Sequence, residues 1–144
     1  MALSNYFENK LIDFLLRGGT YTPPTKLYFA LCTIAPTAAD TGSTITEISG
    51  GNYGRVMIPT GPSKWYTTQG DLTALSTGDT GYTSNVVLIS WGPITWSGTV
   101  VAVAICDQSI NGNLIYFSAL EQNATFSVGN SINFQQGDFV LSFS

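Results

Sequence analysis

The sequence lacks histidine altogether and has few charged side chains: 9 acidic and 5 basic residues among 144, with a formal net charge of −4. Without histidine there is no imidazole general base, no Ser–His or Cys–His nucleophile pair and no histidine-ligated metal. Five scattered basic residues cannot form the cationic stripe that binds a nucleic-acid backbone. We therefore expect no cofactor, no metal centre and no nucleic-acid partner.

Long apolar runs are also missing. The longest, Val100 to Cys106, is far shorter than the roughly 20 residues that cross a bilayer. No basic segment precedes an apolar stretch at the N-terminus, so neither a signal peptide nor a membrane partner is expected. The low charge itself is unusual for a free soluble monomer and more natural for a protein whose surface is covered by neighbours.

Cysteine is nearly absent. Cys32 and Cys106 each lie in an apolar, strand-like run, which favours two buried free thiols that act as small hydrophobic side chains. A disulfide between them is the alternative, although no cysteine-dense framework is present.

What the sequence does contain is the length of one domain, 1–144, opening with a helical pattern. Apolar residues recur at spacings of three and four and predict an amphipathic helix over about 4–17: Leu3, Phe7, Leu11, Phe14 and Leu15. Ser4 is a good N-cap, and Gly18-Gly19 ends the helix. The apolar face needs a partner, either this domain's own sheet, which we expect, or a neighbouring subunit.

From about residue 26 the sequence is β-like. Short strands are predicted at 26–33, 53–58, 84–91, 100–106, 114–118, 124–128, 131–134 and 139–143, with a weak one near 63–68. Asn111-Gly112 and Gly129-Asn130 are hairpin signals. About eight short strands at this spacing predict a mostly β fold, an antiparallel β-sandwich with one N-terminal amphipathic α-helix.

Two Asp-Thr-Gly triplets begin at Asp40 and Asp79. Aspartic proteases use such a pair to share one proton between two carboxylates. Both triplets here follow loop sequence rather than an apolar strand, which is typical of solvated turns. The other acidic residues are dispersed, so we expect no catalytic residues and no enzyme activity.

The aromatic residues are more informative. Four of them lie near predicted turns: Trp65, Tyr66, Trp91 and Trp96. Three interpretations are open: stacking on sugar rings, anchoring a protein interface, or forming the edge of the core. The last is the most ordinary interpretation. With the helix, the Pro23-Pro24 segment and the long 34–52 loop, they supply the candidate interface residues: Tyr6, Phe7, Phe14, Pro23, Pro24, Trp65, Tyr66 and Trp96.

The order of landmarks along nearly the whole chain resembles a family of small virion proteins of tailed bacteriophages. The landmarks are the opening Leu3 to Gly18, Thr20 to Pro24, Leu27 to Leu31, Gly51 to Val56, Trp91 to Thr95 and Gly112 to Phe117. Members of that family are labelled tail-fibre or structural proteins, and some resemble capsid cement (decoration) proteins. The resemblance therefore implies a non-enzymatic protein located in the virion.

Within that family we expect first a cement protein on the outside of the phage head. Its partners would be the major capsid protein and further copies of itself, as a homo-oligomer, because a small protein on a symmetric lattice gains from multivalency. The alternative is a tail-fibre or receptor-binding module that recognises host surface glycan through its exposed aromatic residues.

Overall fold

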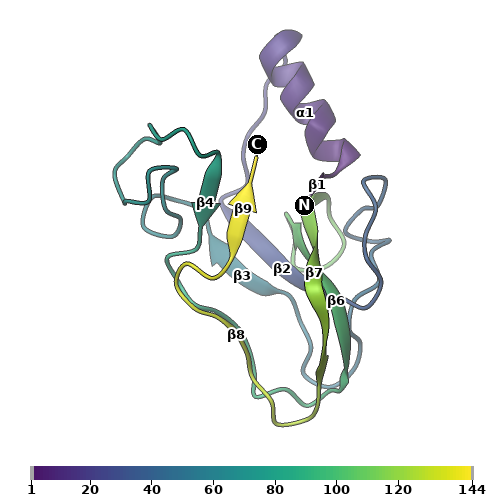
Figure 1. Ribbon diagram of the computed structural model, residues 1–144. Coiled ribbons are helices and arrows are strands. Elements are labelled where there is room, and N and C mark those ends of the chain that lie inside the picture. The colour runs from purple at the N-terminus through teal and green to yellow at the C-terminus, as the bar shows by residue number, and fades with distance from the viewer. Residues whose placement is uncertain (1, 144) are drawn as a thin grey trace.

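A five-stranded antiparallel sheet is the largest element of the structure, a computed structural model that describes residues 2–143 (Figure 1). Its strands run in the order β1 (Ala2–Leu3), β7 (Leu114–Phe126), β6 (Gly98–Cys106), β2 (Lys26–Cys32) and β3 (Val56–Pro59). All five residues from Ala102 to Cys106 lie opposite β2, and this centre of the sheet is apolar on both faces. Such a sheet must be covered on both sides.

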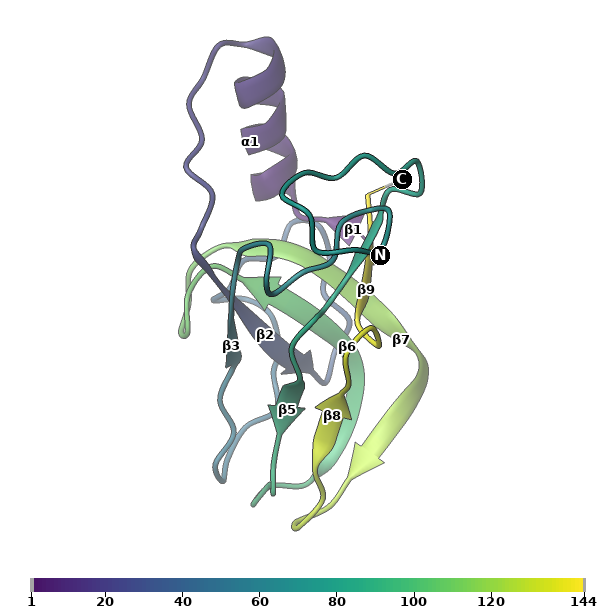
Figure 2. The same ribbon diagram turned by 90° about the vertical axis from the view of Figure 1, so that its left-hand side faces the viewer.

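Two small antiparallel sheets cover one face of it. β4 (Tyr82–Ser84) pairs with β9 (Val140–Ser142), and β5 (Ile89–Trp91) pairs with β8 (Ile132–Phe134). Figure 2 shows β5 and β8 side by side in front of the large sheet. The main core lies between these layers, where the Phe29 ring of β2 meets the Phe139 ring edge-on at 5.0 Å. The predicted fold class, mostly β with antiparallel sheets and one N-terminal helix, is confirmed.

The strand boundaries differ from the prediction where long-range contacts decide them. The runs 114–118 and 124–128 are one strand, β7, which follows β6 past a register shift. The predicted strand 84–91 is interrupted at Asn85, which is fully buried. The side-chain nitrogen of Asn85 donates to the carbonyls of Val87 and Gln135, and its side-chain oxygen accepts from the backbone amide of Phe139. Of the weak 63–68 strand only a bridge between Trp65 and Asn85 forms.

The two hairpin signals have different outcomes. Asn111-Gly112 lies in the β6–β7 hairpin, and both residues have positive φ (57° and 75°), as that motif requires. Gly129-Asn130 forms a turn closed by the Asn130 amide on the Ser127 carbonyl, 3.0 Å. The strands on either side pair with β6 and β5, so this turn joins two sheets and the predicted hairpin is wrong.

Both cysteines are buried free thiols, as expected. In the β2–β6 register Cys32 lies opposite Ala102, whereas Cys106 lies opposite Tyr28. The two are therefore offset by four residues, about 13 Å along the strands, well beyond the ~7 Å Cα separation that a disulfide allows. The disulfide alternative is wrong.

The helix α1 (Asn5–Leu16) begins at the predicted cap and then leaves the sheet. Ser4 accepts from the amide of Phe7 at 3.2 Å, and the amide of Asn5 donates to Ala38 at 2.8 Å. In Figures 1 and 2 the helix stands above the end of the sheet, and none of its residues is buried. The expectation that α1 packs on its own sheet therefore holds only for the start of the helix, where Phe7 packs against the core; the last turn is exposed. No helix within residues 2–143 is long and apolar enough to cross a membrane.

Candidate interaction surface

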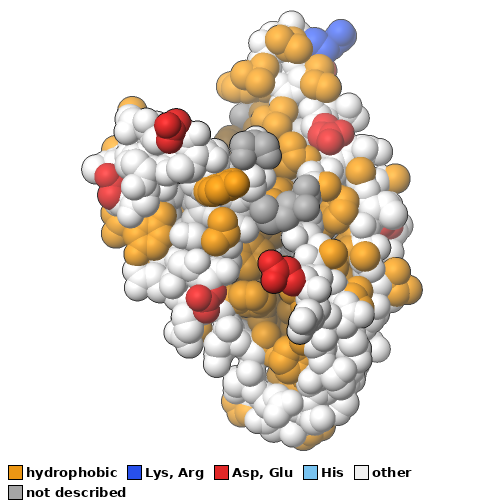
Figure 3. Space-filling model, in the orientation of Figure 1, with side chains coloured by type: hydrophobic (Ala, Val, Ile, Leu, Met, Phe, Trp, Pro, Cys, Tyr) orange, Lys and Arg blue, Asp and Glu red, His pale blue; other side chains and the backbone are white. Residues whose placement is uncertain are grey.

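An apolar groove of about 380 Å³ lies between α1, the segment that returns from it to β2, and the end of the large sheet. Figure 3 shows hydrophobic side chains along α1 at the top of the molecule and continuing below it. We call this site the α1 groove. Every lining residue except Thr60 is aliphatic, aromatic or proline: Phe7, Leu11, Phe14, Tyr21, Pro23, Pro24, Leu27, Ile105, Ile115, Tyr116, Leu141 and Phe143.

Helical spacing builds the first wall of the α1 groove. Phe7, Leu11 and Phe14 are separated by four and three residues and therefore share one face of α1. The opposite wall is the returning segment, in which Pro23-Pro24 favours extended backbone. The Tyr21 ring of this segment lies 5.8 Å from the Phe7 ring, so helix and segment brace each other.

The floor comes from the sheet and the last strand. Burial raises the pKa of the Tyr116 phenol, whose hydroxyl lies 3.3 Å from the carbonyl oxygen of Ser142. Its ring lies 5.8 Å from that of Phe143, which is itself 59% exposed. The floor is therefore apolar and partly open to solvent.

The outer side of α1 carries exposed apolar residues as well: Ile12 at 49%, Leu15 at 71% and Leu16 at 80%. Phe14, in the groove wall, is 53% exposed. Single exposed apolar residues are ordinary, but a contiguous apolar patch beside an apolar groove is typical of a protein contact.

Four of the eight residues predicted as interface, Phe7, Phe14, Pro23 and Pro24, come together in this groove. Tyr6 lies on another face of the helix, where the Lys10 ammonium is 5.6 Å from its ring. Trp65 stacks against Phe29 with ring centroids 6.0 Å apart, far from α1 in the chain and outside the α1 groove. The structure therefore brings half of the candidate residues together in one groove and places the others elsewhere.

Trp96 is not at the surface. It is only 4% exposed, and its ring packs edge-on against Tyr53 at 6.0 Å and Phe126 at 6.5 Å. Trp91 is 5% exposed, and its Nε1 donates to the carbonyl oxygen of Gly54 at 3.0 Å. The turn between them folds both rings inward, so the core-edge interpretation is right for these two and Trp96 offers no exposed face.

Tyr66 lines a second cleft of about 430 Å³ together with Tyr82 and the threonine-rich loop that follows Tyr66. The polar groups of this loop bond to one another. Thr83 Oγ1 donates to the Tyr66 carbonyl at 2.6 Å, and Gln69 Oε1 accepts from the amides of residues 77 and 78. These bonds hold the loop together and occupy many of the polar groups that line the cleft.

The acidic residues of the loops also act locally. The Asp40 carboxylate accepts from the Thr37 amide at 2.8 Å, from the Thr37 hydroxyl and from the Thr44 hydroxyl, and these bonds hold its pKa below the usual range. A proton-sharing dyad needs the opposite, one carboxyl with a raised pKa. Asp40 is thus a loop-building residue. Within residues 2–143 no cluster of three or more histidine, cysteine or acidic side chains has the arrangement of a metal site.

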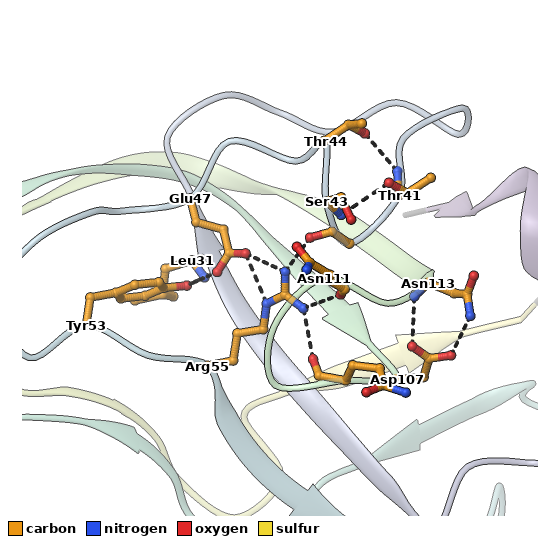
Figure 4. Close-up of polar contacts among 12 residues, drawn as sticks. Leu31, Thr41, Ser43, Thr44, Glu47, Tyr53, Arg55, Asp107, Asn111 and Asn113 are labelled. Carbon is orange, nitrogen blue, oxygen red and sulfur yellow. Dashed lines mark hydrogen bonds and ion pairs between the residues drawn. The ribbon is translucent and has the colours of Figure 1, made fainter.

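A buried ion pair that the sequence did not predict ties loops together outside the α1 groove (Figure 4). The guanidinium of Arg55 bonds Glu47 at 2.6 and 3.0 Å, and the two side chains are only 4% and 18% exposed. Tyr53 donates to the other Glu47 oxygen at 2.6 Å, and its pKa is raised by burial and then by this carboxylate.

The remaining Arg55 donors reach across to other loops. They bond the backbone carbonyls of Gly42 at 2.6 Å, Gln108 at 2.8 Å and Asn111 at 2.9 Å. The 34–52 loop is thereby tied to the β6–β7 connection. The only sequence signal was the Gly51 to Val56 landmark itself, because nothing local shows that Arg55 and Glu47 become buried together.

A family model described as "Podophage GP4 fiber I protein gp80" matches residues 2–142. No curated protein gives a significant match.

Proposed function

The chain belongs to the family of the podophage GP4 fiber I protein gp80, and on that premise we propose that it is a structural subunit of a phage tail fibre. It is a protein of the virion. The family description names a fibre, which supports a place in the tail over the head-cement role that the landmark pattern first suggested. The bonded carboxylates and the absence of histidine support a structural role without catalysis.

The α1 groove is the observation that carries this proposal. A structural subunit needs a surface by which it is held in the particle, and buried apolar contacts supply most of the affinity of such surfaces. The α1 groove and the outer side of α1 are apolar and exposed. The Ser4 cap and the contact between the Phe7 and Tyr21 rings hold the first turn of α1 in place, so the surface is preorganised.

Labelling of purified virions tests the place of the protein. Gold-conjugated antibodies against this chain are applied to particles imaged by electron microscopy, with particles that lack the gene as the control. We expect label on tail fibres, at a copy number that quantitative mass spectrometry finds small relative to the major capsid protein. Label spread over the head, with copies in proportion to capsid subunits, would overturn the fibre proposal in favour of cement.

A further inference from the structure

We propose that the α1 groove of one copy receives the end of α1 from a second copy, with Leu15 and Leu16 as the inserted side chains. The inference deepens the proposed structural role and rests on it, because it names the partner of the same surface. It identifies that partner as this chain itself.

The α1 groove needs an apolar occupant. The groove has a volume of about 380 Å³, and none of its lining residues is charged. Water in such a space makes few of the two to four hydrogen bonds that hold a buried water. Aliphatic side chains fit this lining without leaving a polar group unpaired.

The end of α1 needs an apolar partner. The helix has 12 residues and no buried one, and isolated helices shorter than about 12–15 residues are marginal in water. Ser4 holds its first turn, but nothing comparable covers Leu15 and Leu16, which are 71% and 80% exposed. These two residues therefore gain most from a partner.

Within one copy the two features do not meet. Phe14 faces the α1 groove. Each residue of a helix is rotated by about 100° about the helix axis from the one before it. Leu15 therefore points about a quarter of a turn away from Phe14, and Leu16 points to the opposite side of the helix. Neither leucine lines the groove of its own copy. The chain thus carries an exposed apolar helix end, Leu15 and Leu16, beside an apolar groove that these residues do not fill. In a second copy, the groove can receive this helix end, and the helix end of the second copy can fill the groove of the first.

The available area suits such a contact. Five exposed side chains lie on or beside α1: Ile12, Phe14, Leu15, Leu16 and Phe143. At roughly 150–200 Å² for a fully exposed side chain of this size, they present on the order of 500 Å² of apolar surface. A standard interface takes about 800 Å² from each partner, so these residues and the groove walls supply most of what a stable contact requires.

Size-exclusion chromatography with light scattering of the full chain is the first test. We expect the wild type to show a mass that is a multiple of 15.4 kDa and rises with concentration. Leu15→Glu combined with Leu16→Glu is expected to weaken association at least about tenfold, with an unchanged circular dichroism spectrum. Leu75→Glu is the matched control, since Leu75 is 76% exposed in a distant loop. A wild type that stays monomeric, or a double variant that associates normally, overturns the proposal.

Cross-linking gives an independent readout. One preparation carries Leu16→Cys and the other Phe143→Cys, and the native cysteines are buried and stay out of the reaction. Oxidation of the mixture is expected to give a disulfide-linked pair of the two variants. If the yield of cross-linked Leu16→Cys and Phe143→Cys is no higher than that of Leu75→Cys with Phe143→Cys, the proposed contact is contradicted. A chain that is monomeric but labels tail fibres would refute this contact and leave the proposed function standing. A chain that associates through this contact but labels the head would support the contact and refute the fibre proposal.

Discussion

The backbone amide of Ser4 donates a hydrogen bond of 3.0 Å to the carbonyl oxygen of Ile115, and this contact sets where α1 leaves the sheet. The Ser4 hydroxyl is fully buried, donates to the Leu114 carbonyl and also caps the helix at the amide of Phe7. One serine thus both starts α1 and anchors it to β7. Because the anchor is at the first turn, the far end of the helix is left available for docking.

Ser4→Ala tests this anchor. The substitution removes the cap and leaves the buried carbonyl of Leu114 without its side-chain donor, so we expect a loss of about 2 kcal/mol of unfolding free energy. Urea denaturation measures it. Ser43→Ala, in an exposed loop, is the control and should stay within about 0.5 kcal/mol of the wild type. Equal effects of the two variants would show that Ser4 is not an anchor.

Arg55→Ala is expected to be far more damaging. It leaves the carboxylate of Glu47 buried without its cation and frees three loop carbonyls, and breaking a buried pair from one side costs about 3–5 kcal/mol. Arg17→Ala is the matched control, because the Arg17–Asp13 pair is largely exposed and contributes less than about 1 kcal/mol. Chemical denaturation at one fixed protein concentration compares them. Similar losses for both arginines would contradict the structural role of Arg55.

The tryptophans Trp65 and Trp91 make a second contrast. The Nε1 of Trp91 donates to Gly54, whereas the buried Nε1 of Trp65 has no hydrogen-bond partner within residues 2–143. Trp91→Phe breaks a bond and is expected to cost about 1 kcal/mol more than Trp65→Phe, which removes an unpaired donor. Thermal and urea unfolding of the two variants measure the difference. A larger loss for Trp65→Phe would contradict the contacts assigned to the two indoles.

The thiols predict a pH dependence at the alkaline end. Burial raises the pKa of Cys32 to about 12 and that of Cys106 to about 11, from the ordinary thiol value of 9.0. A group whose pKa is raised on folding contributes its full stability below the unfolded value, and that contribution is lost as the pH rises toward the folded one. Unfolding free energy should therefore fall between about pH 9 and 12, and less so in Cys32→Ala. At pH 8 neither thiol should react with a thiol reagent until urea is added; prompt reaction of the native protein would show that they are accessible.

Local patterns predicted the parts of this fold that depend on neighbours in sequence. The Ser4 cap, the glycines after α1 and the Asn111-Gly112 turn each act within a few residues, and each is confirmed. The shared face of Phe7 and Phe14 follows from helical spacing alone. This is why half of the predicted interface residues line one groove.

Long-range contacts set the rest, and no local pattern contains them. The direction of α1 depends on a bond between Ser4 and Ile115, which are 111 positions apart in the chain. Trp96 lies near a turn in sequence but is enclosed by Tyr53 and Phe126. The burial of Arg55 depends on the loops that close over it.

Hydroxyl-radical footprinting of intact virions tests most directly whether the α1 groove is a contact surface in the particle. The experiment compares the oxidation of Phe14 and Phe143 in virions with that in the monomeric Leu15→Glu/Leu16→Glu protein. In the single chain these two residues are 53% and 59% exposed. Tyr82, which is 51% exposed and lies outside the α1 groove, is the reference. We predict strong protection of both phenylalanines in the virion relative to Tyr82. Phenylalanines that oxidise as readily in the particle as in the monomer would contradict a docking role for the α1 groove.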